Sequence, residues 1–257
     1  MAKKVNFPLK IHLNVDTGIH RQGANLKELD LTIKKLNENK KIKIEGLMTH
    51  LADATNPKPF TTLDQLKKWN EALKIFKKYF SYGTFHFAAT AGTHYLQYGE
   101  SNLIRIGIGL YGFDNFLDKK EKWPLKPILS FWAKIVNLKE IKRGEKVGYN
   151  FLFQAENDLK IATLPCGYYE VIPKAIPNTG FVYFKDQPLR ILGQINMNLL
   201  TVDISQVNQQ LTLEDEIEII SSNPLKFNSF AYYANLFNVS IYEAMVGLAP
   251  NIKRIIK

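Results

Sequence analysis

The segment from His12 to Gly23, HLNVDTGIHRQG, predicts a buried strand that ends in an Asp-Thr-Gly turn and places Arg21 just beyond the strand end. Further along the chain, similar segments carry a polar residue at or just after the predicted strand end: His50, Thr90 and Arg105. Helices are predicted between these strands, a pattern typical of a parallel sheet with right-handed crossovers. Four such units make half of an eight-stranded βα barrel, and we expect the preceding half to be missing from this chain.

Alternating apolar patterns define the elements of this first part. We expect strands at residues 9–15, 42–49, 84–88 and 103–106. Asn25 should cap a first helix, whose apolar face comprises Leu26, Leu29, Ile33 and Leu36. Thr62 and Gln65 have the spacing of a capping box that would open a second helix. The aromatic and apolar residues of that helix predict core packing: Leu66, Trp69, Leu73, Phe76 and Phe80.

The pattern changes after Phe113. The polar segment 114–127 contains Pro124 and Pro127 and is interpreted as a linker. Short strands with turn signals follow, expected at 131–141, 159–164, 199–204 and 216–220, with a hairpin turn at 185–187 and one helix near 228–237. The predicted fold class is therefore α/β plus β: half of a TIM-like βα barrel in 1–113, the linker, and a mostly β domain in 128–257.

The formal net charge of +10 raises the possibility of nucleic-acid binding, but the composition argues against it. Nearly all the positive charge is Lys on presumed helix faces, since the chain has five arginines, and such charge gives non-specific phosphate affinity alone. We expect no nucleic-acid partner.

Other features indicate a soluble, cytoplasmic protein. Cys166 is the single cysteine, so no disulfide framework is possible and a reducing compartment is expected. No apolar run approaches the ~20 residues needed to cross a bilayer, so we expect no membrane association. The first residues have no apolar core of a signal peptide. His86 and His94 have no Cys or carboxylate at metal-ligand spacing, and no metal site is predicted.

The polar residues at the strand ends should meet at one mouth, because parallel βα units gather their functional groups at the carboxyl ends of the strands. Phosphate often binds the loops that follow the last two strands of such barrels. Here these loops are 86–93, which offers the Thr90 hydroxyl, and 105–113, which offers the N–H groups of Gly107 and Ile108.

Six segments occur in the order seen in bacterial alanine racemases: DTGIHRQG, GLMTHLADAT, RIGIGLYGF, LPCGYYE, GQINMNL and SIYEAMVGLAP. From about Pro8 to its end, the chain resembles the second barrel half and the C-terminal β domain of that family. The resemblance implies interconversion of L- and D-alanine for the cell wall, pyridoxal 5'-phosphate (PLP) as cofactor, alanine as substrate and a homodimer. Serine and broad-specificity racemases share these motifs, so the amino acid itself stays open.

The resemblance also implies the cofactor site. Thr90, Gly107 and Ile108 match positions that hold the PLP phosphate, and Tyr242 matches a phenol near the cofactor. Arg105 matches the arginine that faces the pyridine nitrogen. A guanidinium does not give up its proton to a pyridine, so that nitrogen would stay unprotonated.

Tyr149 matches the tyrosine that acts as one of two opposed bases and reaches the site from the partner subunit. A phenol titrates near about pH 10, so it needs neighbours that lower its pKa, and His50 and Arg21 match the residues that do so. Tyr168 and Met197 match the substrate-facing wall contributed by the partner subunit.

Some positions depart from the family pattern. The family's cofactor-bonding lysine lies on the first barrel strand in a motif like VVKANAYGHG, which no segment here matches; Lys3, Lys4 and Lys10 precede the first strand or enter it from the wrong end. Asn14 stands where many members have a carbamylated lysine. Glu170 and Asn198 stand at or near usual Asp positions and predict a looser polar network.

We therefore expect a truncated reading frame, half of a split gene or a remnant. One hypothesis is a racemase that is active only with a separate N-terminal half. A second is an inactive half-barrel that dimerises through its β domain, and a third is a basic nucleic-acid binder. Each site residue also has a structural alternative: Arg105 as a strand-end ion pair, His50 as a barrel histidine, and Tyr149 and Tyr168 as ordinary β-domain tyrosines.

Overall fold

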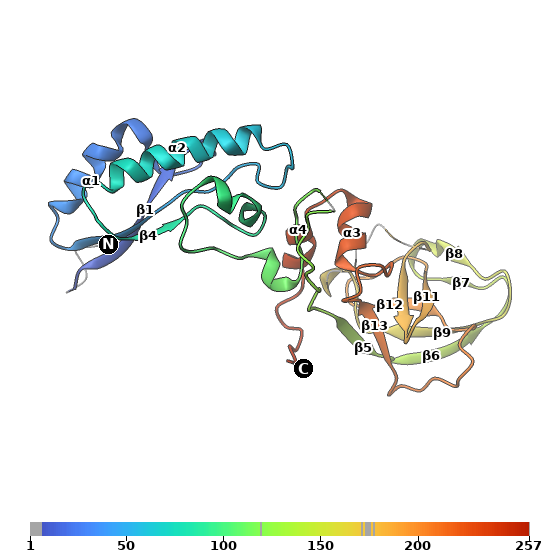
Figure 1. The fold of residues 1–257 in the computed structure, drawn as a ribbon. Coiled ribbons are helices and arrows are strands. Elements are labelled where there is room, and N and C mark those ends of the chain that lie inside the picture. Colours follow the sequence, from blue (N-terminus) through green and yellow to red (C-terminus); the bar gives the residue numbers. More distant parts are fainter. Residues whose placement is uncertain (1–6, 119, 171, 173–175, 177, 257) are drawn as a thin grey trace. The chain divides into compact units, whose positions relative to one another are not determined.

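The computed structural model describes residues 7–118, 120–170, 172, 176 and 178–256. The chain divides into two compact units, Met1–Lys126 and Pro127–Lys257, and each is described by itself (Figure 1). Among the described residues, no helix is both long and apolar enough to span a bilayer.

The first unit alternates strands and helices as the sequence predicts. Its four-stranded sheet has the order β2-β1-β3-β4, with every neighbouring pair parallel. The strands are β1 (Leu9–Asp16), β2 (Ala24–Asn25), β3 (Ile42–Met48) and β4 (Thr84–His86). Helices α1 (Leu29–Asn37) and α2 (Phe60–Phe76) lie over one face of the sheet (Figure 1). The predicted half-barrel is present, and its strands end at a common edge.

The core of this unit lies between the sheet and the two helices. It comprises fully buried side chains from both layers, among them Val15, Leu29, Ile33, Leu47, Trp69, Phe76 and Phe87. Burial of each such side chain stabilises the fold by roughly 1.5–3 kcal/mol. Lys10 and His12 alternate along β1 with Ile11 and Leu13, which pack against the core. The second face of β1 therefore carries polar side chains.

Two local predictions for this unit are wrong. Residues 103–106 form no regular strand: Leu103 N–H donates to the Phe85 carbonyl and Arg105 N–H to the Ala88 carbonyl, without a continuous ladder. The fourth strand of the sheet is instead the short β2 on the opposite edge.

Thr62 and Gln65 form no capping box, because α2 begins at Phe60, ahead of both residues. The Thr62 hydroxyl donates to the Asp53 carbonyl, and Gln65 points its amide into the neighbouring loops. Asn25 does accept a hydrogen bond from Lys27 N–H, at the start of a 3-10 helix (Leu26–Glu28) that leads into α1.

The second unit is mostly β, as predicted. Its seven-stranded sheet has the order β5-β13-β10-β11-β12-β9-β6, and β7 pairs with β8 in a separate two-stranded sheet. The strands are β5 (Phe131–Lys134), β6 (Asn137–Ile141), β7 (Lys146–Val147), β8 (Phe153–Gln154), β9 (Leu159–Leu164), β10 (Phe181–Phe184), β11 (Gln187–Leu192), β12 (Leu200–Asp203) and β13 (Glu216–Ile220). Helices α3 (Phe230–Phe237) and α4 (Ile241–Val246) follow.

The single strand predicted at 131–141 is two strands, because the chain changes partner at Ile135 and Val136. Ile135 N–H donates to the Asp215 carbonyl next to β13, whereas Val136 N–H donates to the Thr163 carbonyl on β9. β5 and β6 thus occupy the two ends of the sheet order although two residues separate them, so the sheet curls back toward itself. The predicted hairpin at 185–187 is present as the β10–β11 turn, with Lys185 at φ 56°.

Candidate functional site

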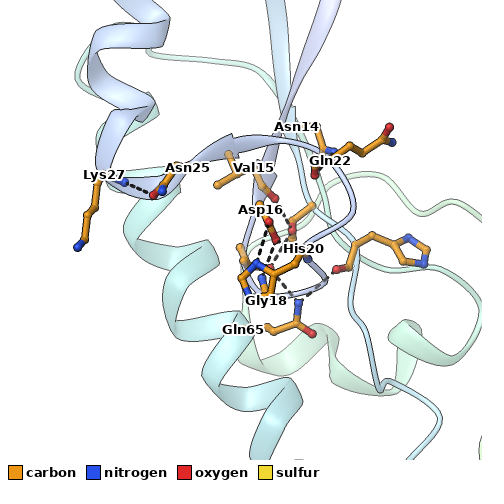
Figure 2. A network of polar contacts seen from close by, with 12 residues as sticks. Asn14, Val15, Asp16, Gly18, His20, Gln22, Asn25, Lys27 and Gln65 are labelled. Atoms are coloured by element: carbon orange, nitrogen blue, oxygen red, sulfur yellow. Dashed lines mark hydrogen bonds and ion pairs between the residues drawn. The ribbon is translucent and has the colours of Figure 1, made fainter.

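The loop after β1 is shaped by Asp16 (Figure 2). Its Oδ1 accepts from the N–H groups of Gly18 at 3.0 Å and His20 at 3.1 Å, and its Oδ2 lies 3.1 Å from His20 Nδ1. Burial acts to raise the pKa of Asp16, but the hydrogen bonds from His20 and Gly18 outweigh it and lower the pKa below 3.8. Asn14 Nδ2 donates to the Gln22 carbonyl at 3.1 Å. The residues on both sides of Arg21 are therefore held in place.

Arg105 lies across the carboxyl ends of β3 and β4. Its Nη2 donates to the Thr49 carbonyl at 2.8 Å and its Nη1 to the His86 carbonyl at 3.0 Å. The same Nη2 lies 3.3 Å from Nδ1 of His50. Burial, followed by the positive charges of Arg105 and Arg21, lowers the pKa of His50 below 6.5. The structure thus brings Arg21, His50 and Arg105 together at the predicted mouth.

A chain of imidazole contacts extends from Arg105 under the mouth. Arg105 Nη1 lies 2.5 Å from His86 Nδ1, and His86 Nε2 lies 2.7 Å from His12 Nδ1. A guanidinium donates only, so His86 Nδ1 accepts, and the His86 proton sits on Nε2 and is donated to His12. Burial, together with the charges of Arg105 and His12, lowers the pKa of His86 to about 4. His86 is therefore neutral near pH 7.

The Thr90 hydroxyl gathers backbone N–H groups from the loop that follows Arg105. Thr90 Oγ1 accepts from Gly109 N–H at 3.1 Å and from Gly107 N–H at 3.3 Å. A Cβ on Gly109 would lie 3.1 Å from Thr90 Cγ2 and 3.3 Å from Thr90 Oγ1, so glycine permits this close approach. Ile108 begins the 3-10 helix Ile108–Tyr111 and is buried. This loop brings a hydroxyl, two backbone N–H groups and small residues together, and the N–H groups would exchange Thr90 for a phosphate oxygen if one bound there.

Lys10, one of the lysines nearest the predicted first strand, does not face the mouth. Lys10 lies near the start of β1, about 20 Å from the carboxyl end of the strand at ~3.3 Å per residue. Its Nζ pairs with Glu45 at 3.1 Å. Lys3 and Lys4 lie outside the described residues. In the described part of the chain, no group of three or more His, Cys, Asp and Glu side chains is placed to hold a metal ion.

In the second unit, Tyr149 opens a 3-10 helix (Tyr149–Phe151) and is exposed. Its loop has an unusual backbone, with Gly148, Asn150 and Phe151 at positive φ. Asn150 Nδ2 donates to Gln194 Oε1 at 3.0 Å. A Cβ on Gly193 would lie 2.6 Å from the Val147 carbonyl oxygen, so the two loops are in close contact. The phenol of Tyr149 is held outward on a fixed loop.

Tyr168 and Met197 belong to adjoining loops of the same unit. Tyr168 N–H donates to the Asn196 carbonyl at 3.1 Å, and Tyr169 N–H donates to the Met197 carbonyl at 3.0 Å. Both Tyr168 and Met197 are exposed. These two side chains therefore lie on adjoining, exposed loops. Tyr242 lies on α4.

Sequence reasoning missed several polar residues that support the mouth. The sequence predicts no metal-ligating role for His86 and a capping role for Gln65, and it assigns neither residue to the mouth. His12 offered one signal, because it alternates with apolar residues on β1 and so shares a face with Asn14. Its pairing with His86, 74 residues away, depends on strand order and could not be read from local pattern.

Comparison with known proteins agrees with this geometry. Residues 1–115 match the family model "Alanine racemase, N-terminal domain", and residues 128–256 match "Alanine racemase, C-terminal domain". Alanine racemase of Borreliella burgdorferi (strain ZS7) is 30% identical over 91% of this chain, and the match spans 64% of that relative. Alanine racemase of Francisella philomiragia is 30% identical over 99% of this chain and 70% of its own length.

A solved structure gives the same result. Alanine racemase from Bartonella henselae, with covalently bound pyridoxal phosphate, is 27% identical, with a TM-score of 0.79 over 99% of this chain and 68% of that one. The chain thus spans about two thirds of the proteins it matches. With both domain models matched in order and 30% identity to relatives along nearly its whole length, this chain belongs to the alanine racemase family.

Proposed function

We propose that the chain is the larger part of a PLP-dependent alanine racemase, which interconverts L- and D-alanine and supplies D-alanine for the cell wall. The observation that carries the proposal is the Thr90 hydroxyl with the N–H groups of Gly107 and Gly109 gathered on it, beside the cluster of Arg105, His50 and Arg21. An anion site next to buried cationic and imidazole groups is what a phosphorylated pyridine cofactor requires.

The donor set fits PLP. Thr90, Gly107 and Ile108 would hold the phosphate, and Arg105 would face the ring nitrogen. When bound, PLP withdraws electrons from an amino acid and so makes its α-proton acidic. Burial lowers the pKa of Arg105, yet its Nη atoms donate to the Thr49 and His86 carbonyls and the group remains a donor. Arg105 would therefore orient the ring nitrogen and would transfer no proton to it.

The proposed acid–base group of this chain is Tyr149, acting across a homodimer into the mouth of the partner subunit. Arg21 and His50 would stabilise the phenolate there, because Arg21 supplies positive charge and the lowered pKa of His50 keeps its imidazole neutral and able to donate or accept a hydrogen bond. Tyr168 and Met197, from adjoining loops, would form the wall that limits substrate size. Tyr242 would lie near the cofactor.

The amine that bonds the cofactor would come from a separate stretch of polypeptide, because Lys10 is held by Glu45 at the opposite end of β1. The test is alanine α-proton exchange in deuterated water, with PLP. It compares the chain alone with the chain plus a polypeptide covering the part of the Borreliella relative that this chain does not match. Exchange from both enantiomers in the mixture supports the proposal. A stable, PLP-loaded complex without exchange would instead indicate an inactive dimerisation module.

A further inference from the structure

Gln65 is buried on α2, yet it is an amide in a layer of apolar residues. Its side chain reaches the segments that follow β1 and β3 (Figure 2). Oε1 accepts from Ala52 N–H at 2.8 Å, and Nε2 donates to Thr17 Oγ1 at 3.1 Å and to the His50 carbonyl at 3.3 Å. One side chain therefore joins the loop that leads to Arg21 with the backbone of His50.

The orientation of this amide is fixed by its backbone partners. Ala52 N–H can only donate, so the atom that faces it is Oε1. The His50 carbonyl can only accept, so the atom that faces it is Nε2. Both donor hydrogens of Nε2 are then used, one on His50 and one on Thr17. The Gln65 amide cannot rotate by half a turn without losing its hydrogen bonds to Ala52 and His50.

The direction of the next bonds follows from this orientation. Thr49 Oγ1 lies 2.8 Å from the Val15 carbonyl, which can only accept, so the Thr49 hydroxyl donates there. The Thr49 hydroxyl has a single hydrogen, which is already donated to Val15. Thr49 Oγ1 therefore accepts in its 2.9 Å contact with Thr17. Thr17 in turn accepts from Gln65. Both threonines are almost fully buried, so each hydroxyl is satisfied by this single arrangement.

We propose that Gln65 is a positioning residue which, through Thr17 and Thr49, locks the loop of Arg21 and the segment of His50 in one relative position at the mouth. An effect of this positioning on the turnover rate rests on the proposed racemase function. The hydrogen bonds that fix the two segments do not depend on that function. Gln65 contacts no reacting atom in this account. It sets where the His50 imidazole stands relative to Arg105 and Arg21.

The packing around Gln65 restricts what can replace it. Gly18, at φ 143°, has its missing Cβ position 3.4 Å from Gln65 Cγ, so the turn after β1 lies directly on the Gln65 side chain. Methionine has a similar length and no hydrogen-bonding amide. Gln65→Met therefore keeps the packing and removes the three hydrogen bonds.

The test uses the full chain without cofactor and measures two local properties by NMR: amide hydrogen exchange at Ala52 and the titration of the His50 imidazole. Gln65→Met should raise Ala52 exchange at least about tenfold, because its acceptor is lost. In Gln65→Met and in Thr17→Val the pKa of His50 should rise toward 6.5, because a released His50 is better solvated. Thr17→Ser keeps the hydroxyl and should leave the pKa of His50 as in the wild type. Glu71→Met, at an exposed position of α2, is the matched control.

If Gln65→Met fails to fold, comparison of the two Thr17 variants still tests the proposal. If Thr17→Val and Thr17→Ser both fold and give the same His50 pKa, the positioning role of Gln65 and Thr17 is wrong. A folded Gln65→Met with wild-type Ala52 exchange would contradict that role as well. Failure of the NMR test would not affect the proposed racemase activity. A chain with the predicted NMR behaviour but no alanine exchange would support the positioning role of Gln65 and contradict the proposed activity.

Discussion

The side-chain amide of Asn198 donates to the buried carboxylate of Glu170 at 3.0 Å, and the other oxygen of that carboxylate accepts from Gly167 N–H at 2.8 Å. These two residues join the loops of Met197 and Tyr168. The sequence suggested a looser network at these positions. In the structure the longer Glu170 and the neutral Asn198 complement each other, so the proposed substrate wall is held by a satisfied pair.

Asn198→Asp should weaken this pair. The variant loses the donor and places a second carboxylate beside Glu170, which should lower the free energy of unfolding by about 1–3 kcal/mol at pH 7. The loss should shrink toward pH 4, because protonation of one carboxylate removes the repulsion. Urea unfolding at both pH values measures it, with Asn208→Asp at an exposed position as the control. An equal loss at both pH values would contradict the charge argument.

Asp114 should anchor the segment that leaves the first unit. Burial acts to raise the pKa of Asp114, but the N–H groups of Trp123 and Phe116, with His94, lower it below 3.8. A lowered folded pKa gives stability that is present above about pH 4 and is lost below it. Asp114→Asn should therefore destabilise the chain by about 1–3 kcal/mol at pH 7 and less at pH 3.

Urea unfolding followed by tryptophan fluorescence checks this effect, since Trp123 N–H donates to Asp114 at 2.9 Å. Exposed Asp64, replaced by Asn, is the control. Equal destabilisation of the Asp114 variant at both pH values would show that the carboxylate charge is not involved.

His86 should make the protein less stable in mild acid. Its pKa of about 4 lies below the ordinary 6.5, so between these values the unfolded chain binds more protons and stability falls as the pH falls. The contribution is roughly 3 kcal/mol across this window, at about 1.36 kcal/mol for each pKa unit. His86→Gln should flatten that part of the profile of unfolding free energy against pH. A long-range nitrogen NMR spectrum should place the His86 proton on Nε2, and a proton on Nδ1 would contradict the bond from Arg105.

Thr90→Val should weaken PLP binding about tenfold to a hundredfold, because one hydrogen bond to a charged phosphate contributes about 1.5–3 kcal/mol. Thr90→Ser keeps the hydroxyl and should bind nearly as the wild type does. Fluorescence titration with PLP measures the affinity, and pyridoxal without its phosphate provides the comparison. If Thr90→Val weakens pyridoxal and PLP equally, Thr90 does not bind the phosphate.

The elements that the sequence predicted well have strong local patterns. The strands at 159–164 and 216–220 match the structure at both ends, since their apolar residues form short runs between turn signals. The predictions failed where partners are distant. Residues 103–106 have strand-like residues but form isolated hydrogen bonds to Phe85 and Ala88. Gln65 has the spacing of a cap, yet its amide serves loops that lie elsewhere in the sequence.

The site shows the same division. Parallel strands deliver their carboxyl ends to one edge, so the convergence of Arg21 and His50 could be predicted from the strand pattern. Arg105 reaches the same edge although its segment forms no strand. The contacts among them could not be predicted. His12 and His86 meet because β1 and β4 flank β3, where Gly46 leaves room: a Cβ there would lie 3.2 Å from His12 Cδ2. Such a pairing requires the three-dimensional register.

Tyr149→Phe tests whether Tyr149 is one of two opposed bases, in the chain mixed with a polypeptide covering the part of the Borreliella relative that it does not match and loaded with PLP. Alanine α-proton exchange in deuterated water is followed separately from L-alanine and from D-alanine. Removal of a general base typically costs about 10²–10⁴-fold, and two opposed bases act on opposite faces of the substrate. We predict that Tyr149→Phe slows exchange from one enantiomer by such a factor and slows exchange from the other far less. Wild-type rates from both enantiomers would contradict the assignment of Tyr149 and the two-base account.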